Sequence, residues 1–160
     1  MWFVWRDGRL LVQTDAASLR EAGAQVTVWP ARAARETAAG FDLIVLGGPL
    51  YSGRWHRDAH GFLKRHRREL ADVPVAVFAM GPRTDTAEAW QHSRAQLDRA
   101  LAKHGWLTPA AVTVFGGVDP PGHGRRPRRD LRNWQAIDAW AADALAAAGW
   151  TGQGRSTAAR

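Results

Sequence analysis

Three short segments of this chain combine glycine turns with aromatic or hydrogen-bonding residues, and each directly follows an apolar run. They are residues 47–55, 81–85 and 116–119. Glycine turns release backbone N–H groups that can hydrogen-bond the polar edge of a ligand. Tyr51 and Trp55, both in the first segment, can stack on the faces of a flat aromatic ring. The three segments therefore predict a site for a flat aromatic ligand.

The apolar runs that precede these segments predict the strands that position them. Residues 41–46, 73–80 and 110–115 read FDLIVL, VPVAVFAM and AAVTVF, continuous runs typical of parallel strands that are buried on both faces. Residues 1–5 and 25–29 predict two further strands, so the count is five. Ligands of open α/β sheets bind outside the carboxyl ends of the strands, where all three segments would lie.

Helical patterns alternate with these strands. They cover residues 9–22, with Gly23 as a stop, 56–70, a stretch from an N-cap at Asp85 or Thr86 to His104, and a last helix that ends at Gly149. Residues 31–39 are weakly helical. The predicted inward-facing residues are Ala59, Phe62, Leu63, His66 and Leu70 in the second helix, Trp90, Leu97 and Leu101 in the third, and Trp134, Ile137, Ala141 and Leu145 in the last, with Trp140 also in the core.

This alternation predicts an α/β fold: a single three-layer doubly wound domain with a five-stranded parallel sheet of order 2-1-3-4-5. The domain is expected to span residues 1–148, and residues 149–160 are expected to form a flexible C-terminal tail.

Composition excludes several classes of site. The chain has no cysteine, which excludes disulfides, thiolate metal sites and a Cys nucleophile. It has neither an apolar run of about 20 residues nor a signal peptide, so we expect a cytoplasmic protein without a transmembrane segment. The formal charge of +7 points to an anionic partner. Arginine carries most of that charge, in a chain that is rich in alanine. As the anionic partner, nucleic acid is the weaker hypothesis.

The strand ends also argue against several familiar α/β chemistries. A receiver domain would need an Asp after the third strand, where this chain has Gly47, Gly48 and Pro49. No GxGxxG or GxxxxGK[ST] motif follows any strand, which argues against a dinucleotide or P-loop site. The six histidines show no metal-ligand spacing such as HExxH, so we assign no metal ligand and no catalytic residue.

Four stretches together carry a resemblance to a known family: DLIVLGGPLYSGRWHRDAHGFLKRH, VPVAVFAMGP, VTVFGGVDP and DLRNWQAIDAW. Over residues 19–145 the chain resembles the flavodoxin-domain family that includes menaquinone-dependent protoporphyrinogen dehydrogenase. The resemblance implies a flavodoxin fold that binds one FMN noncovalently and moves electrons through it. As partners it implies a redox protein, or a small-molecule or quinone acceptor.

By position, the resemblance assigns FMN-binding residues to two loops. Those in the loop after the third strand are Gly47, Gly48, Pro49, Leu50, Tyr51, Ser52, Gly53 and Trp55, and those after the fourth strand are Met80, Gly81, Pro82 and Arg83. Family members hold the phosphate in a first loop rich in Ser, Thr and Gly, where this chain has Arg6, Asp7 and Gly8. Arg6 and Gly8 would attract the phosphate and Asp7 would repel it.

We therefore expect a flavodoxin-like FMN-binding protein that acts in electron transfer or as an FMN-dependent oxidoreductase. The loop after the fifth strand is short and basic, whereas the protoporphyrinogen-oxidising branch is expected to carry a long, partly apolar insertion there, so a generic flavodoxin-like role is favoured. The alternative is a flavodoxin-fold module that has lost FMN and binds a partner through the arginines of this loop: Arg125, Arg126, Arg128, Arg129 and Arg132.

Overall fold

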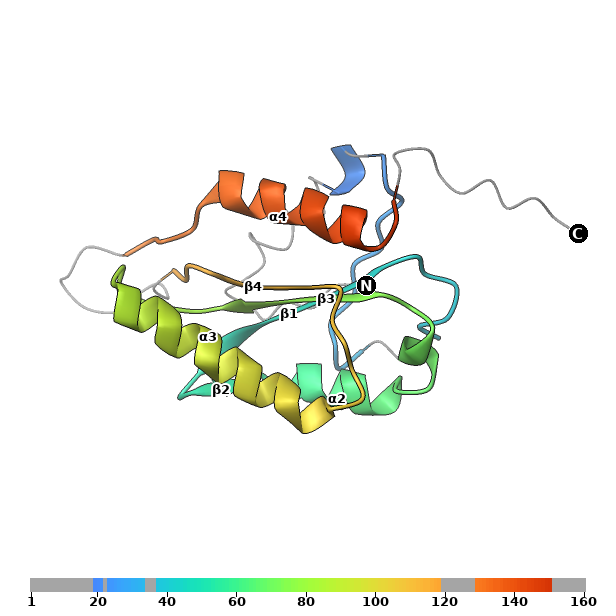
Figure 1. Cartoon of the computed structure of the whole chain (residues 1–160), viewed down its shortest axis with the longest axis horizontal. Helices are drawn as coiled ribbons and strands as arrows, with labels where there is room; N and C mark the ends of the chain where they lie inside the picture. The colour runs from blue at the N-terminus through green and yellow to red at the C-terminus, as the bar shows by residue number, and fades with distance from the viewer. Residues whose placement is uncertain (1–18, 22, 34–36, 119–128, 151–160) are drawn as a thin grey trace, which may run out of the picture.

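A mostly parallel sheet lies between two helical layers. The computed structural model describes residues 19–21, 23–33, 37–118 and 129–150. Helices α2 (Arg57–Arg65) and α3 (Ala87–Leu101) cover one face of the sheet, and α4 (Trp134–Ala147) covers the other (Figure 1). Short 3₁₀ helices, η1 (Glu69–Ala71) and η2 (Ala102–His104), follow α2 and α3. The strands are β1 (Ile44–Tyr51), β2 (Arg54–Trp55), β3 (Val75–Met80) and β4 (Ala111–Phe115).

The strand order in the described residues is β2-β1-β3-β4, in which β1, β3 and β4 are parallel. These three are the predicted third, fourth and fifth strands, in the predicted order. The five-strand count is not confirmed. Residues 25–29 lie outside any strand, and their expected neighbour, residues 1–5, lies outside the described residues. Strand β2 was not predicted and pairs antiparallel with the end of β1.

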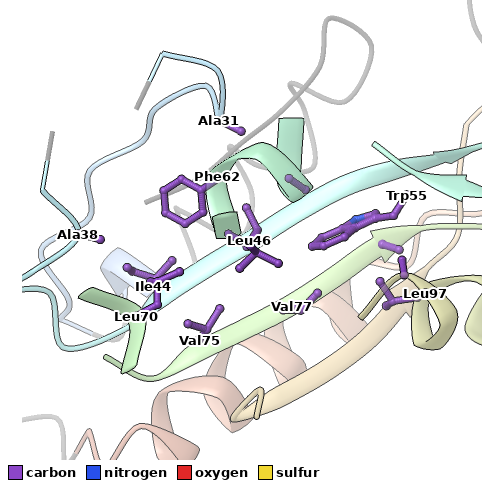
Figure 2. Packing of buried hydrophobic residues seen from close by; sticks show 14 of the residues in the cluster. Ala31, Ala38, Ile44, Leu46, Trp55, Phe62, Leu70, Val75, Val77 and Leu97 are labelled. Carbon is purple, nitrogen blue, oxygen red and sulfur yellow. The ribbon is translucent and has the colours of Figure 1, made fainter. Parts of the chain in front are cut away.

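Alternation along the central strands divides the core between the two layers. Ile44 and Leu46 of β1 pack under α2 and α3, together with Val77 of β3 (Figure 2). Val45 of β1 and Phe78 of β3 pack on the opposite face, under α4. Both faces of β1 and β3 are buried, as the continuous apolar runs predict.

The helices follow the predicted patterns with shorter bounds. All five predicted inward-facing residues of the second helix are buried, although α2 ends at Arg65 and Leu70 belongs to η1. Thr86 is the N-cap of α3 and its hydroxyl accepts a hydrogen bond from Ala89 N–H. In α4, Trp140 is buried, whereas the predicted core position of Trp134 is wrong because its side chain is 37% exposed.

Glycines end the first and last helical segments, as predicted. Gly149 has a φ of 76° and donates to the Ala146 carbonyl, and Trp150 N–H donates to the Leu145 carbonyl. This pair of bonds is a Schellman motif, which satisfies the last carbonyls of α4. Gly23, with a φ of 86°, makes the same pattern after the helical residues 19–21. None of the helices in the described ranges has the length and apolarity needed to cross a membrane.

Candidate functional site

The first predicted ligand loop is a β-hairpin. Strand β1 continues to Tyr51, and a two-residue turn returns the chain to β2, so that Tyr51 pairs with Arg54 and Leu50 with Trp55. The φ angles of Ser52 and Gly53 are 46° and 75°, both positive as in a type I′ turn. The hairpin presents Tyr51 at its tip, where the side chain is 41% exposed.

Gly47 and Gly48 are strand residues, so the prediction of a turn at this glycine pair is wrong. Gly47 pairs with Phe78 and Gly48 with Ala79 in the parallel ladder. A Cβ atom on Gly47 would lie 2.0 Å from Cζ of the Phe78 ring. The close approach that these glycines predict does occur, and it is an approach to the protein's own core. Both residues are buried, and the next residue, Pro49, is half-buried and pairs with Met80.

Trp55 lies in the core. Its side chain is 2% exposed, and its ring contacts the ring of His60 edge-on at 5.6 Å between centroids. Figure 2 shows the indole among the buried side chains near Leu97. The indole Nε1 is buried and has no hydrogen-bond partner among the described residues. In this structure Trp55 therefore offers no ring face to a ligand, and Tyr51 is the accessible aromatic residue of the hairpin.

The second loop begins at a tightly packed glycine. Gly81 N–H donates to the Phe115 carbonyl at 2.8 Å, and a Cβ atom on Gly81 would lie 2.4 Å from Cγ1 of Val114. Met80 is half-buried and packs toward the core under α4, and Pro82 is buried. Arg83 is exposed. Of the four predicted residues in this loop, Arg83 thus has the side chain best placed to meet a ligand.

A hydrogen bond joins the third predicted segment, which begins at Gly116, to the second. Gly117 N–H donates to the Pro82 carbonyl at 3.3 Å, and the Gly117 carbonyl accepts from Leu131 N–H at 3.0 Å. An antiparallel bridge joins Val118 to Asp130 and closes the base of the arginine-rich loop. Residues 119–128, which include three of the arginines proposed as a partner contact, lie outside the described residues.

An ion pair and an aromatic contact hold the returning end of that loop. Arg132 Nε donates to Asp130 Oδ1 at 2.7 Å, and Arg132 Nη2 also pairs with Asp130 Oδ2. The guanidinium lies 4.9 Å from the centre of the Trp134 ring. The hydrogen bonds from Arg132 to Asp130 raise the pKa of the guanidinium. Arg132 therefore serves the loop's own structure, which leaves it less available to a partner than the sequence suggests.

The sheet register brings the three segments to one edge. Pro49 pairs with Met80 and Met80 pairs with Phe115, so these residues form a row across the parallel strands. The hairpin tip, Arg83 and Gly117 each follow a member of this row, and the strand ends lie together on the left in Figure 1. The predicted convergence at the carboxyl edge is present. Arg6 and Gly8, the predicted phosphate contacts, lie outside the described residues.

Two polar residues behind this edge were not predicted. Ser93 and Gln96 are buried on α3. Ser93 Cβ would lie 2.9 Å from a Cβ atom on Gly81, and Gln96 Nε2 would lie 3.7 Å from one on Gly53. Ser93 therefore packs beside the second loop, and Gln96 lies beside the hairpin turn. Their signal in the sequence is a polar residue at positions 93 and 96, on the otherwise apolar stripe that contains Leu97.

The described ranges contain no cluster of three or more His, Asp or Glu side chains that could hold a metal ion. Among the predicted site residues that the structure describes, the exposed side chains are those of Tyr51, Ser52 and Arg83. A ring, a hydroxyl and a cation suit an aromatic ligand with polar or anionic substituents.

Comparison with solved structures shows the fold. The rubredoxin oxygen:oxidoreductase of the anaerobe Desulfovibrio gigas is 14% identical, with a TM-score of 0.54 over 92% of this chain and 34% of that one. The Flv1 flavodiiron core of Synechocystis sp. PCC6803 is 13% identical, with a TM-score of 0.54 and the same coverages, 92% and 34%. This chain thus spans about a third of the length of either protein.

Sequence comparison identifies the family. No curated protein matches the chain. The family model described as a flavodoxin domain matches residues 12–128, which is more than half of the chain and contains β1 to β4 with the hairpin and the second loop. The protein is a member of the flavodoxin domain family.

Proposed function

We propose that the protein binds FMN at the carboxyl edge of the sheet and acts in electron transfer or as an FMN-dependent oxidoreductase. The observation that carries this proposal is the exposed Tyr51 at the hairpin tip, beside the edge where β1, β3 and β4 end. Membership of the flavodoxin domain family supports FMN as the ligand. When bound, the flavin supplies the redox chemistry.

The chemical types of the residues at this edge suit the binding of a flavin. Tyr51 offers a ring face for stacking, and Ser52 and Gly53 are exposed in the turn beside it, where hydroxyl and backbone groups can bind the polar edge of the ring. Arg83 adds a cation from the second loop. The packed glycines Gly47 and Gly81 hold the strand ends in place and belong to the scaffold of the site.

The partner of such a protein would be anionic. The chain carries a formal charge of +7, and opposite charges accelerate association between proteins. We therefore propose an acidic redox protein, or an anionic small-molecule or quinone acceptor.

The test is an absorption and fluorescence titration of the purified protein with FMN. We expect flavin bands that co-purify or appear on addition, with flavin fluorescence quenched on binding. Tyr51→Ala should weaken binding roughly fivefold or more, because an aromatic stack contributes about 1 kcal/mol beyond burial. Tyr51→Phe keeps the ring and should bind nearly as tightly as the parent protein. Equal affinity of the Ala and Phe variants would remove Tyr51 from the site.

A colourless protein that ignores FMN would favour the second candidate, a module that binds a partner through its arginine-rich loop. The pinned base of this loop, closed by the Val118–Asp130 bridge at the same sheet edge, is the observation in favour of it. Replacing Arg125, Arg126 and Arg128 with Gln should then abolish binding to an acidic partner. Unchanged binding by that variant would discard the module hypothesis.

A further inference from the structure

Two histidines from different elements meet between α2 and η2, the short helix that follows α3. His60 Nδ1 in α2 lies 2.7 Å from Nε2 of His104, the last residue of η2. The two rings are nearly parallel, with 5.0 Å between centroids and 22° between planes. A hydrogen bond between ring nitrogens requires a proton on one nitrogen and a free lone pair on the other. At least one of the two imidazoles must therefore be neutral.

The surroundings of the pair disfavour added protons. His104 is only 2% exposed. Burial first, and then His104, Lys103 and Lys64, lower the pKa of His60 to about 4. Burial, Lys64 and Lys103 also lower the pKa of His104. The charges that the described residues direct at the pair are thus these two lysines, Lys64 from α2 and Lys103 from η2, with no carboxylate among them.

Each histidine of the pair also contacts a tryptophan ring. Trp55 of β2 contacts the His60 ring edge-on at 5.6 Å, and Trp106, which follows η2, contacts the His104 ring edge-on at 6.2 Å. Neither indole can neutralise an imidazolium as a carboxylate would. Trp55 also pairs with Leu50 in the hairpin ladder. Through the Trp55 ring, the histidine pair therefore contacts the hairpin whose tip carries Tyr51.

We propose that His60 and His104 form a proton-sensitive latch, which ties α2 to η2 while neutral and releases this contact when the protein is acidified. With both rings protonated, two N–H groups would face each other at the shared position, so the hydrogen bond is lost and like charges meet beside two lysines. Release would withdraw the ring that packs against Trp55. This latch is independent of the proposed function, because it needs no ligand.

The sign of the pH effect follows from the protons bound in each state. Since the pKa of both histidines is lower in the folded protein, the unfolded chain binds more protons below the ordinary histidine value of 6.5. The folding equilibrium constant should therefore fall as the pH is lowered from 6.5 towards 4, by up to about tenfold per pH unit for each histidine.

The test compares urea unfolding between pH 7.5 and 4 in the parent protein and in the double variant His60→Asn/His104→Gln. The Asn amide stands near the position of Nδ1 and the Gln amide near that of Nε2, so the variant can keep a side-chain hydrogen bond that does not titrate. Between pH 7.5 and 4, we expect the folding equilibrium constant of the double variant to fall much less than that of the parent protein. His92→Gln replaces an exposed histidine of α3 and should keep the parental pH dependence.

A double variant that loses stability with pH as steeply as the parent would overturn the latch. If the double variant does not fold, the titration of His60 and His104 in the parent protein, followed by NMR, decides the question. Midpoints for both histidines below the ordinary value of 6.5 would support the latch. A midpoint at or above that value for either histidine would refute it.

Discussion

At the scale of single residues, Gly47 shows how little room the centre of the sheet leaves. The Phe78 ring fills the space where a side chain at position 47 would lie, and that ring is itself held by Phe115 and Trp140, at 5.5 and 5.8 Å between centroids. We expect Gly47→Ala to lower the free energy of unfolding by about 1–3 kcal/mol, the usual effect of overpacking a core. Urea unfolding at neutral pH measures this change.

The matched control for that prediction is Gly61→Ala. Gly61 lies inside α2, and a Cβ atom there would meet nothing within 4 Å. Alanine should stabilise the helix by roughly 0.5–1 kcal/mol relative to glycine. A Gly47→Ala protein as stable as the parent would show that the Phe78 ring can move aside.

At the scale of elements, one carboxylate fastens the segment before β1 to η1. Glu69 Oε2 accepts hydrogen bonds from Ala38 N–H and from Thr37 Oγ1, the latter at 3.1 Å, and lies 3.4 Å from Nδ1 of the buried His66. The Ala38 hydrogen bond is the main reason that the pKa of Glu69 is lowered from its ordinary value of 4.5. The ionised form is thus the one that stabilises the fold.

We expect Glu69→Gln to be less stable than the parent by about 1 kcal/mol at neutral pH. The substitution removes the charge of the acceptor, and hydrogen bonds to a neutral acceptor are weaker. A group whose pKa is lowered by folding loses its stabilising effect as the pH falls through and below its ordinary value. The difference between parent and variant should therefore shrink below about pH 4.5. Asp143→Asn, on an exposed position inside α4, is the control and should show no such trend. A difference that is constant with pH would contradict the role of the charge.

At the scale of the whole molecule, the proposed site divides between the described sheet edge, which would hold the flavin ring, and the first loop, which would meet the phosphate. That loop contains Asp7 beside Arg6 and Gly8. Because Asp7 opposes a phosphate, FMN should bind less than about tenfold more tightly than riboflavin, which has the same ring without the phosphate. Thermal shifts with the two ligands at equal concentrations compare these affinities.

Asp7→Asn separates the two parts of the site. It should tighten FMN binding and leave riboflavin binding unchanged, because it removes a like charge without touching the ring contacts. A parent protein that binds FMN strongly and ignores riboflavin would contradict this division and would place most of the binding energy on the phosphate.

Much of the fold could be predicted because local pattern decides it. The continuous apolar runs of β1 and β3 can be satisfied only by burial on two faces, so helices must lie on both sides of the sheet. Gly23 and Gly149 end helices because their positive φ is easy for glycine alone. Thr86 caps α3 for an equally local reason, since its hydroxyl reaches an N–H three residues ahead.

The tertiary structure decided what depends on residues far apart in the chain. Gly47 and Gly48 resemble a turn in the sequence, yet they continue a strand because they pair with Phe78 and Ala79 of the neighbouring strand, whose Phe78 ring fills the space beside Gly47. Trp55, expected to face a ligand, lies in the core because its pairing with Leu50 places it in the cluster that packs under α2 and α3. His60 and His104 are 44 positions apart, and their contact exists only after α2 and η2 pack. Periodicity and turn chemistry are properties of neighbouring residues, whereas the occupant of a given space in the core is set by the packing of the whole sheet.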